Sequence, residues 1–275
     1  MIQEISVYCP AAISFIFRAF LYDDPLQTGS TGVGCTLDRG VTVTVSKAPK
    51  TEIVFNNDCI EFPTTQSVIG FLTVESVRVE IESAFPLACG FGISGASALA
   101  TAYALNQLFS THMDEEKLLA IAHRAEILNK TGLGTVGTQW VGGFLLKNKP
   151  GLPVIYTKLP FVGNKLYSRV FAPRQTAGVI SKSVEKINTE AQKALQTIEK
   201  NHETLSDIFR PSYIYARDSG LLSGVCQNYI ETVQKSGGNA TMHMVGDVVV
   251  SDTAISYERG QLYEYNVSND RVRVL

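Results

Sequence analysis

The stretch Pro86-Leu-Ala-Cys-Gly-Phe-Gly-Ile-Ser-Gly-Ala-Ser97 places three glycines within six residues, and an Ala/Leu-rich run from Ala96 to Phe109 follows at once. Glycine permits a positive φ angle and lets a ligand approach the backbone closely. Helix-forming residues directly after the glycines predict a helix N-terminus there, with unpaired N–H groups and a positive dipole end. This combination is typical of a phosphate-binding loop.

Two common phosphate motifs fit this stretch poorly. Gly90, Gly92 and Gly95 have the spacing of a dinucleotide fingerprint, but that motif follows a hydrophobic strand and precedes a helix–strand unit, whereas Pro86 interrupts the approach here. A Walker loop ends in Gly-Lys-Ser/Thr, and no lysine follows Gly95. A third pattern fits: Pro, three residues, Gly, a hydrophobic residue, Gly, any residue, Ser and two small residues. The alternative is a glycine-rich helix start that only packs closely.

Composition narrows the class of protein. The chain has 275 residues and a formal net charge of −2, which gives no electrostatic indication of a nucleic-acid or membrane partner. Its five cysteines are scattered and form no CxxC pair, which favours reduced thiols and a cytoplasmic protein. The apolar start from Ile5 to Leu21 contains Pro10 and Arg18 and is too short to span a bilayer. A strand followed by a turn is expected there.

Alternating apolar residues predict strands, and turn residues predict the connections between them. A turn is expected over 9–12, a glycine-rich loop over 23–34 and a hairpin over 52–62. The predicted strands are 2–8, 40–45, 74–81, 154–159, 165–171 and 240–250, with a closing hairpin over 254–275. The composition changes near 147–151, which predicts two domains, 1–150 and 151–275.

Helical periodicity predicts a second helix from Asp114 to Leu128 and further helices over 183–209 and 212–235, the first with a break and the second interrupted near 219–220. Glu126 lies at the edge of the apolar stripe of the second helix. A carboxylate near a buried face is unfavourable unless it is paired or bound to a cation, although an ordinary helix rim also holds such a residue. A second glycine-dense segment, from Lys130 to Gly143, follows it.

This order of motifs resembles the GHMP family of small-molecule kinases. Within the family the resemblance is closest to the archaeal pantoate kinases, and it covers nearly the whole chain. Four segments carry it: 29–41, the phosphate loop, 122–134 and 241–246. The resemblance implies an α+β GHMP kinase fold, with an N-terminal domain like ribosomal protein S5 domain 2 and a C-terminal ferredoxin-like domain. It also implies ATP-dependent phosphorylation of pantoate to 4-phosphopantoate, in archaeal coenzyme A biosynthesis, with a homodimer as one expected assembly.

The resemblance also implies roles for individual residues. Ser94 and Glu126 would bind Mg²⁺ and act in catalysis, and Arg39 would pair with the substrate carboxylate, a structural salt bridge being the alternative for Arg39. The residues expected to bind ATP are Pro86, Gly90, Phe91, Gly92, Ile93, Ser94, Gly95 and Ala96. The residues expected to face the small hydroxy acid substrate are Ser30, Thr31, Gly32, Asp38 and Arg39.

Four positions depart from the pattern. Ile93 replaces a serine of the loop, Thr31 an arginine, and residues 12–15 a His-Ile-Thr-Gly-like segment. Thr135 stands at the position of an expected catalytic aspartate, so its own catalytic role is open. Homoserine kinases work without that carboxylate, since metal and loop stabilise the transferring phosphoryl group. The alternatives are a GHMP kinase for another small alcohol, such as mevalonate or homoserine, a regulatory nucleotide-binding pseudo-kinase and a non-catalytic dimeric scaffold.

Overall fold

The computed structural model describes residues 4–174 and 184–275; positions 2, 3 and 183 of the predicted elements lie outside them. Strands and helices alternate along the chain. In order they are β1 (Glu4–Phe20), β2 (Gly29–Lys47), β3 (Glu52–Phe55), β4 (Asp58–Cys59), α1 (Pro63–Leu72), β5 (Val77–Ser83), α2 (Ile93–Leu108), α3 (Glu115–Asn129), α4 (Thr135–Val141), β6 (Phe144–Lys147), β7 (Tyr156–Leu159), β8 (Lys165–Ala172), α6 (Val184–Lys200), α7 (Leu205–Asp218), α8 (Gly224–Lys235), β9 (Ala240–Met242), β10 (Asp247–Ser251), β11 (Gln261–Ser268) and β12 (Arg273–Val274).

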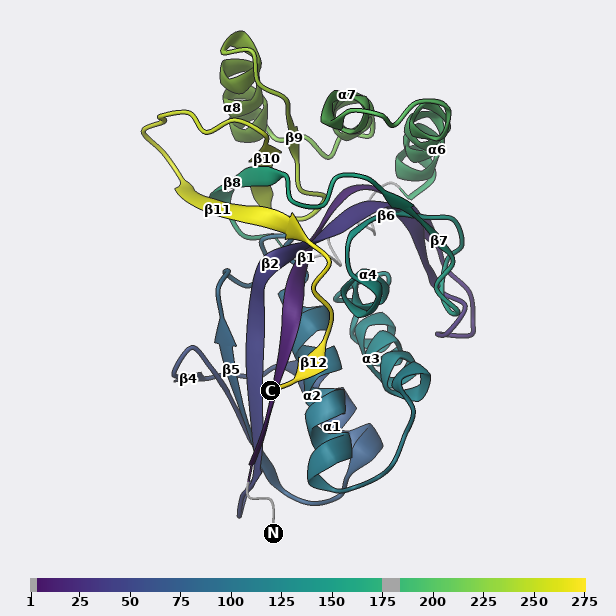
Figure 1. Ribbon diagram of the computed structural model, residues 1–275, viewed down its shortest axis with the longest axis vertical. Helices are drawn as coiled ribbons and strands as arrows, with labels where there is room; N and C mark the ends of the chain where they lie inside the picture. The colour runs from purple at the N-terminus through teal and green to yellow at the C-terminus, as the bar shows by residue number, and fades with distance from the viewer. Residues whose placement is uncertain (1–3, 175–183) are drawn as a thin grey trace.

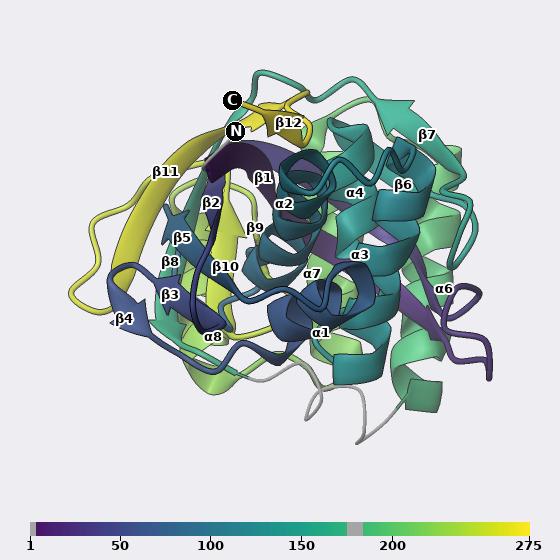
Figure 2. The same cartoon turned by 90° about the horizontal axis from the view of Figure 1, so that it is seen from below.

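The elements gather into two groups that share strands (Figure 1). In the lower group, β1, β2 and β5 form a sheet. Helix α2 packs against one face of it, and α1 and α3 pack on α2, so that the helices lie on one side of the sheet, as the view from below also shows (Figure 2). In the upper group, β8, β9, β10 and β11 pair antiparallel, with α7 and α8 packed on β9 and β10. This mixture of helices and a largely antiparallel sheet confirms the predicted α+β class.

Helix α2 is the centre of the lower group. It is apolar around its whole circumference, and all but two of its residues, Ser94 and Gln107, are buried. A helix without a polar face is stable only where every side has a partner. Strands β1 and β2 cover one side of α2, and α1, α3 and α4 cover the others. The N-terminus of α2 is therefore fixed in depth and direction by the core.

Strands β1 and β2 form one long antiparallel ribbon, which differs from the expected turn and glycine loop. Pro10 lies at a bulge between Pro10 and Ala12, which accommodates a residue that cannot donate a ladder hydrogen bond. Residues 29–34, expected as a loop, are strand. Gly34 lies so close to β1 that a Cβ there would be 2.6 Å from the carbonyl oxygen of Ile13. Glycine density here indicates close strand contact.

The helical predictions over 183–235 are confirmed with shifted ends. The predicted break lies at 201–204, where Thr204 and Asp207 form a capping box that begins α7. Helix α7 ends at Asp218, next to the predicted interruption at Ser219-Gly220. No helix among residues 4–174 and 184–275 is both long and apolar enough to cross a membrane.

Strand β11 joins the two groups of strands, since it pairs with β8 along most of its length and with β2 at its end. The carboxylate of Asp38 lies at this junction. It accepts hydrogen bonds from the backbone N–H of Asn266, at 3.0 Å, and from the side-chain amide of the same residue, at 2.7 Å. Asp38 therefore acts as a side-chain extension of the β2–β11 ladder. The proposed boundary near residue 150 stays a prediction.

We predict that Asp38→Ala lowers the melting temperature by roughly 2–4 °C, the effect expected for losing exposed hydrogen bonds in a chain of this size. Thermal unfolding followed by circular dichroism would measure it. The control is Asp23→Ala, in an exposed turn, which should leave the midpoint unchanged. Equal melting temperatures for wild type and Asp38→Ala would contradict this role.

Candidate active site

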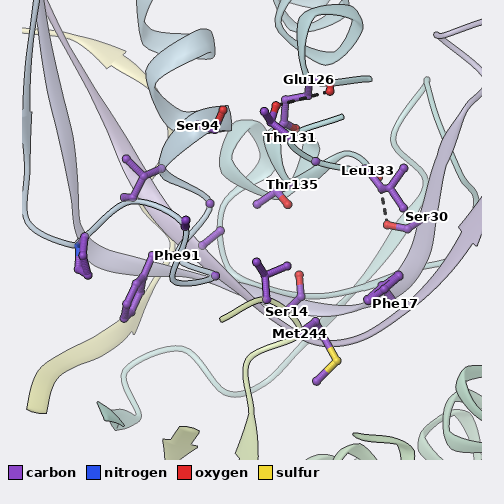
Figure 3. A pocket seen from close by; sticks show the side chains of 18 residues that line it. Ser14, Phe17, Ser30, Phe91, Ser94, Glu126, Thr131, Leu133, Thr135 and Met244 are labelled. Carbon is purple, nitrogen blue, oxygen red and sulfur yellow. Dashed lines mark hydrogen bonds between the residues drawn. The ribbon is translucent and has the colours of Figure 1, made fainter. Parts of the chain in front are cut away.

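An open cavity of about 130 Å³ lies where the N-terminus of α2 meets β1, the end of α3 and the turn between β9 and β10. Figure 3 shows Ser94, Glu126 and Thr131 on one side of it, with Ser14 and Met244 on the opposite side. The lining residues are Ala12, Ser14, Phe17, Ser30, Pro86, Ala88, Gly90, Phe91, Gly92, Ile93, Ser94, Glu126, Thr131, Gly132, Leu133, Thr135, Met244 and Val245.

The glycine loop before α2 is held by its carbonyl groups. Four carbonyl oxygens between Ala88 and Gly92 each accept a hydrogen bond from a donor elsewhere in the chain, at 2.9–3.2 Å. The donors are the backbone N–H of Arg174 for Ala88, the ring of His243 for Cys89, the backbone N–H of Ala12 for Phe91 and the side-chain amide of Gln139 for Gly92. The loop is therefore fixed from outside, on its carbonyl side.

The N–H groups of the same loop are unused. Within residues 4–174 and 184–275, no backbone N–H from 90 to 95 donates a hydrogen bond to the protein. Gly90 and Gly92 have φ angles of 73° and 66°, and Gly92 is the N-cap of α2. Successive free N–H groups at a helix N-terminus attract an anion, because the helix dipole adds to their partial charges. The predicted phosphate loop thus has the geometry of an anion site.

A buried relay of hydrogen-bonded side chains, Tyr265, Ser168 and His243, supports this loop from the C-terminal strands. Nδ1 of His243 lies 3.2 Å from the Cys89 carbonyl, which can only accept, so Nδ1 carries the proton. Nε2 must then accept, and the Ser168 hydroxyl donates to it across 2.9 Å. The Tyr265 hydroxyl in turn donates to Ser168. Burial lowers the pKa of His243 to about 4, which keeps the ring neutral and the relay directed toward the loop.

Glu126 reaches the cavity from the last turns of α3. It is 1% exposed, and burial raises the pKa of its carboxyl to about 7, with Val136 and Lys147 acting in the opposite direction. Its Oε2 atom has no hydrogen-bond partner within the described part of the chain. A buried carboxylate with an unpaired oxygen at a cavity wall is unfavourable by itself, and a bound cation would satisfy it.

The structure places the hydroxyl of Ser94 at the start of α2, in a row of three hydroxyl groups of which that of Thr64 is buried. Ser94 donates to Thr64 across 3.0 Å, and the oxygen of Thr64 lies 2.9 Å from that of Thr131. Thr131 immediately follows α3, so the row connects the start of α2 with the end of the helix that carries Glu126. No described group of three or more His, Cys, Asp or Glu side chains forms a metal cluster. Magnesium needs few protein ligands, and Ser94 and Glu126 fit that requirement.

A small second cavity continues behind the first, past Ser14, Ser30 and Thr135. Lys147, on β6, lies at its wall and donates to the carbonyl of Gly134 across 3.0 Å. Burial lowers the pKa of Lys147 to about 8, and the negative charge of Glu126 opposes that change. Of the described residues that line the two cavities, Lys147 is the one basic side chain.

Most, but not all, of the predicted site residues line the main cavity. The two proposed metal ligands, Thr135, and the loop residues Pro86 and Gly90 to Ser94 all line the main cavity. Gly95 and Ala96 lie one step deeper, inside α2. Ser30 lines the main cavity and Gly32 the smaller one, while Thr31 faces a groove toward α6.

Asp38 and Arg39 lie outside both cavities. The guanidinium of Arg39 lies over the Phe85 ring, 5.4 Å from its centroid, and donates to the Glu264 carbonyl. For these two residues the structure therefore favours a role in joining β2 to β11 over contact with substrate. The substrate-binding prediction treated Asp38 and Arg39 as part of the motif that begins at residue 29. Successive side chains of a strand point to opposite faces of the sheet, so the residues of such a motif do not all face one cavity.

Sequence reasoning missed three supports of the site: Gln139, Lys147 and the relay through His243. One feature of the sequence could have revealed Gln139 and Lys147: each is a polar side chain within an apolar segment. His243 was interpreted as an ordinary strand residue, and nothing in its flanking sequence reveals that Ser168 and Tyr265 lie beside it. These supports arise from long-range packing.

Comparisons with known proteins agree with this geometry. Residues 62–141 match the family model described as GHMP kinases N terminal domain. The chain is 30% identical to a pantoate kinase of Methanospirillum hungatei over 258 residues, 89% of this chain and 86% of the relative. It is 30% identical to a pantoate kinase of Methanocaldococcus jannaschii, covering 88% and 90%. A solved structure described as a phosphotransferase related to the CoA biosynthesis pathway superposes with a TM-score of 0.85, 25% identity and 98% coverage of both chains.

The buried carboxyl of Glu126 predicts a pH-dependent stability difference. Because its folded pKa is raised, the folded state takes up a proton more readily than the unfolded state, so wild type loses stability as pH rises from about 4.5 to about 7. Glu126→Gln carries no charge at any pH. Its stability relative to wild type should therefore increase from pH 5 to pH 8, measured by urea unfolding at each pH. Glu116→Gln, exposed on the same helix, is the control. A pH-independent difference would contradict a raised pKa.

Proposed function

The chain belongs to the pantoate kinase family of GHMP kinases, and from this premise we propose that it transfers the terminal phosphoryl group of ATP to pantoate. The products are ADP and 4-phosphopantoate, in coenzyme A biosynthesis. The observation that carries the proposal is the convergence on one cavity of the free N–H groups of the loop, Ser94 and the unpaired oxygen of Glu126. These groups match the needs of phosphoryl transfer, which are positioning and charge neutralisation.

The glycine loop would hold the phosphates of ATP. Its N–H groups from 90 to 95 are free, and the outward hydrogen bonds of the loop carbonyls keep those acceptors occupied. An anion would thus meet donors already in place, so little reorganisation is needed on binding. Preorganised donors of this kind stabilise charge that develops during reaction more effectively than water does.

Ser94 and Glu126 would hold Mg²⁺ beside the phosphates. Glu126 supplies an unpaired carboxylate oxygen, and Ser94 supplies an oxygen whose proton is already donated to Thr64. When bound, the ion would neutralise charge on the phosphate oxygens of ATP. Its binding would also favour the ionised form of Glu126, whose raised pKa reflects burial without a full partner.

Lys147 would recognise the carboxylate of pantoate. It lies at the wall of the smaller cavity, beyond Thr135 as seen from the main cavity. Among the residues that the structure describes, its ammonium group makes one hydrogen bond, to Gly134, which leaves further donors available. A substrate carboxylate seated there would satisfy a buried cation and leave the hydroxyl end of the substrate in the main cavity, toward the glycine loop.

Thr135 lies between the two cavities and carries no carboxylate. The reaction forms a bond between the pantoate hydroxyl oxygen and the γ-phosphorus, breaks the bond to the leaving ADP oxygen and releases the hydroxyl proton. Because the transition state is loose, little nucleophile activation is required. The residues of this chain would act by holding the hydroxyl in line with the phosphate, and Thr135 would contact the substrate without serving as a base.

The experiment that tests the function is ADP release from Mg²⁺ATP, measured by a coupled assay with pantoate, mevalonate, homoserine and shikimate in turn. Pantoate should give the highest kcat/KM. Turnover with another alcohol alone would support a different GHMP kinase activity. Nucleotide binding without turnover on any acceptor would support the pseudo-kinase alternative.

We predict that Gly92→Val reduces ATP affinity at least tenfold while the protein stays folded. A Cβ at residue 92 would lie 2.7 Å from Cγ2 of Thr135, and the φ angle of 66° strains any residue other than glycine. Isothermal titration calorimetry would measure the affinity. Gly163→Val is a matched control, since its φ is 88° but a Cβ there meets nothing within 4 Å. Comparable ATP affinity in both variants would contradict the loop assignment.

We predict that Lys147→Met raises the KM for pantoate by about 10- to 100-fold, the cost of losing a buried hydrogen bond to a charged group. The KM for ATP should change less than twofold, since Lys147 does not contact the loop. Steady-state kinetics with each substrate varied would measure both. Lys149→Met, exposed two residues away, is the control. An equal rise in both KM values would indicate a structural role for Lys147.

A further inference from the structure

Thr64, on the first turn of α1, is fully buried and lies between the two proposed metal ligands. Its hydroxyl accepts from Ser94 across 3.0 Å and contacts the hydroxyl of Thr131 across 2.9 Å. Thr131 in turn donates to the backbone carbonyl of Glu126 across 3.5 Å. Thr64 is thus the middle group of a row that runs from the start of α2 to the end of α3.

The row has a direction. The carbonyl of Glu126 can only accept, so the Thr131 hydroxyl donates to it. Thr131 is then an acceptor for the single proton of Thr64, and Thr64 is an acceptor for the single proton of Ser94. Ser94 has one proton to give, and its bond to Thr64 uses that proton. Ser94 consequently presents lone pairs to the cavity and no proton.

We infer that Thr64 is a positioning residue that makes Ser94 a cation ligand. An oxygen that offers only lone pairs can bind Mg²⁺, whereas it cannot donate a hydrogen bond to a phosphate oxygen. This inference rests on the proposed function, because it assumes that Ser94 and Glu126 share the metal. It goes further in assigning the orientation of the Ser94 hydroxyl to a residue on α1 that does not itself line the cavity.

The position of Thr64 is itself constrained by α3. Asn129, at the end of α3, donates from its side-chain amide to Ser67, one turn further along α1, across 2.8 Å, and to the carbonyl of Ala125, also across 2.8 Å. These bonds link α1 to the helix that carries Glu126. The acceptor for Ser94 and the carboxylate of Glu126 therefore belong to one rigid pair of helices, which sets the spacing of the two ligands.

The neighbouring residue supplies a matched control. Thr65 is also fully buried in the first turn of α1, but its hydroxyl has no hydrogen-bond partner within the described residues. Threonine and valine have nearly the same shape, so Thr64→Val and Thr65→Val remove one buried hydroxyl each at adjacent positions. Only the first change releases the proton of Ser94. Thr64→Ser keeps the hydroxyl and serves as the rescue variant.

The test is the binding of ADP in the presence of Mg²⁺ and in the presence of EDTA, measured by titration calorimetry for wild type and the three variants. Thr64→Val should reduce the gain in ADP affinity that Mg²⁺ provides by about tenfold, with ADP affinity in EDTA within twofold of wild type. Thr64→Ser and Thr65→Val should keep the full Mg²⁺ gain. In turnover, Thr64→Val should require a higher Mg²⁺ concentration for half-maximal rate.

Two results would overturn the inference. Equal losses for Thr64→Val and Thr65→Val would show that buried hydroxyls matter here only for packing. A loss of ADP affinity for Thr64→Val that is the same in EDTA would show that Thr64 shapes the glycine loop and does not act through the metal. Because ADP binding needs no acceptor, failure of this inference is distinguishable from failure of the proposed pantoate activity, which wild-type turnover tests separately.

Discussion

The structure depends on one constraint, the saturation of the loop carbonyls between Ala88 and Gly92. A glycine-rich segment has many accessible conformations, and ordering it costs more backbone entropy than ordering any other sequence. Four hydrogen bonds from four separate segments offset that cost. Because the carbonyl groups are occupied, the opposite side of the loop exposes N–H groups. The anion site is thus a consequence of where the acceptors are satisfied.

A second balance lies deeper in the site, between the charges of Glu126 and Lys147. Each is buried, and burial moves the pKa of each toward the neutral form, to about 7 for the carboxyl and about 8 for the amine. Each charge partly compensates the other, although neither is satisfied completely. A site with an incompletely compensated anion on one side and cation on the other favours a ligand pair of opposite charges. The metal ion and the substrate carboxylate of the proposed reaction would form such a pair.

The features that could be predicted from the sequence are those set by residues close together in the chain. The glycine loop and α2 were predictable, because turn residues and helix formers act within a few residues of each other. Glu126 was placed at a helix edge by periodicity, with its burial left open. The ribbon of β1 and β2 was missed, since Pro10 and the glycines of 29–34 indicate turns when read singly and are accommodated only by a long-range partner strand. Lys147, Gln139 and His243 reach the site through packing that no local pattern encodes. Asp38 and Arg39 were expected beside the substrate because the motif was extended along a strand, and in the structure they lie outside both cavities.

The relay through His243 has a consequence for when the glycine loop takes its shape during synthesis of the chain. The ring that holds the Cys89 carbonyl belongs to residue 243, 154 positions later in the chain. Its own donor, Ser168, comes from β8, and Tyr265 of β11 donates to Ser168. While the ribosome is still extending the polypeptide, the segment up to residue 150 already contains every N–H group of the candidate anion site, yet lacks two of the four donors that hold the loop carbonyls, Arg174 and His243. The loop therefore reaches its final shape only when the last strands dock. The shape of the proposed phosphate loop thus depends on strands that are synthesised last.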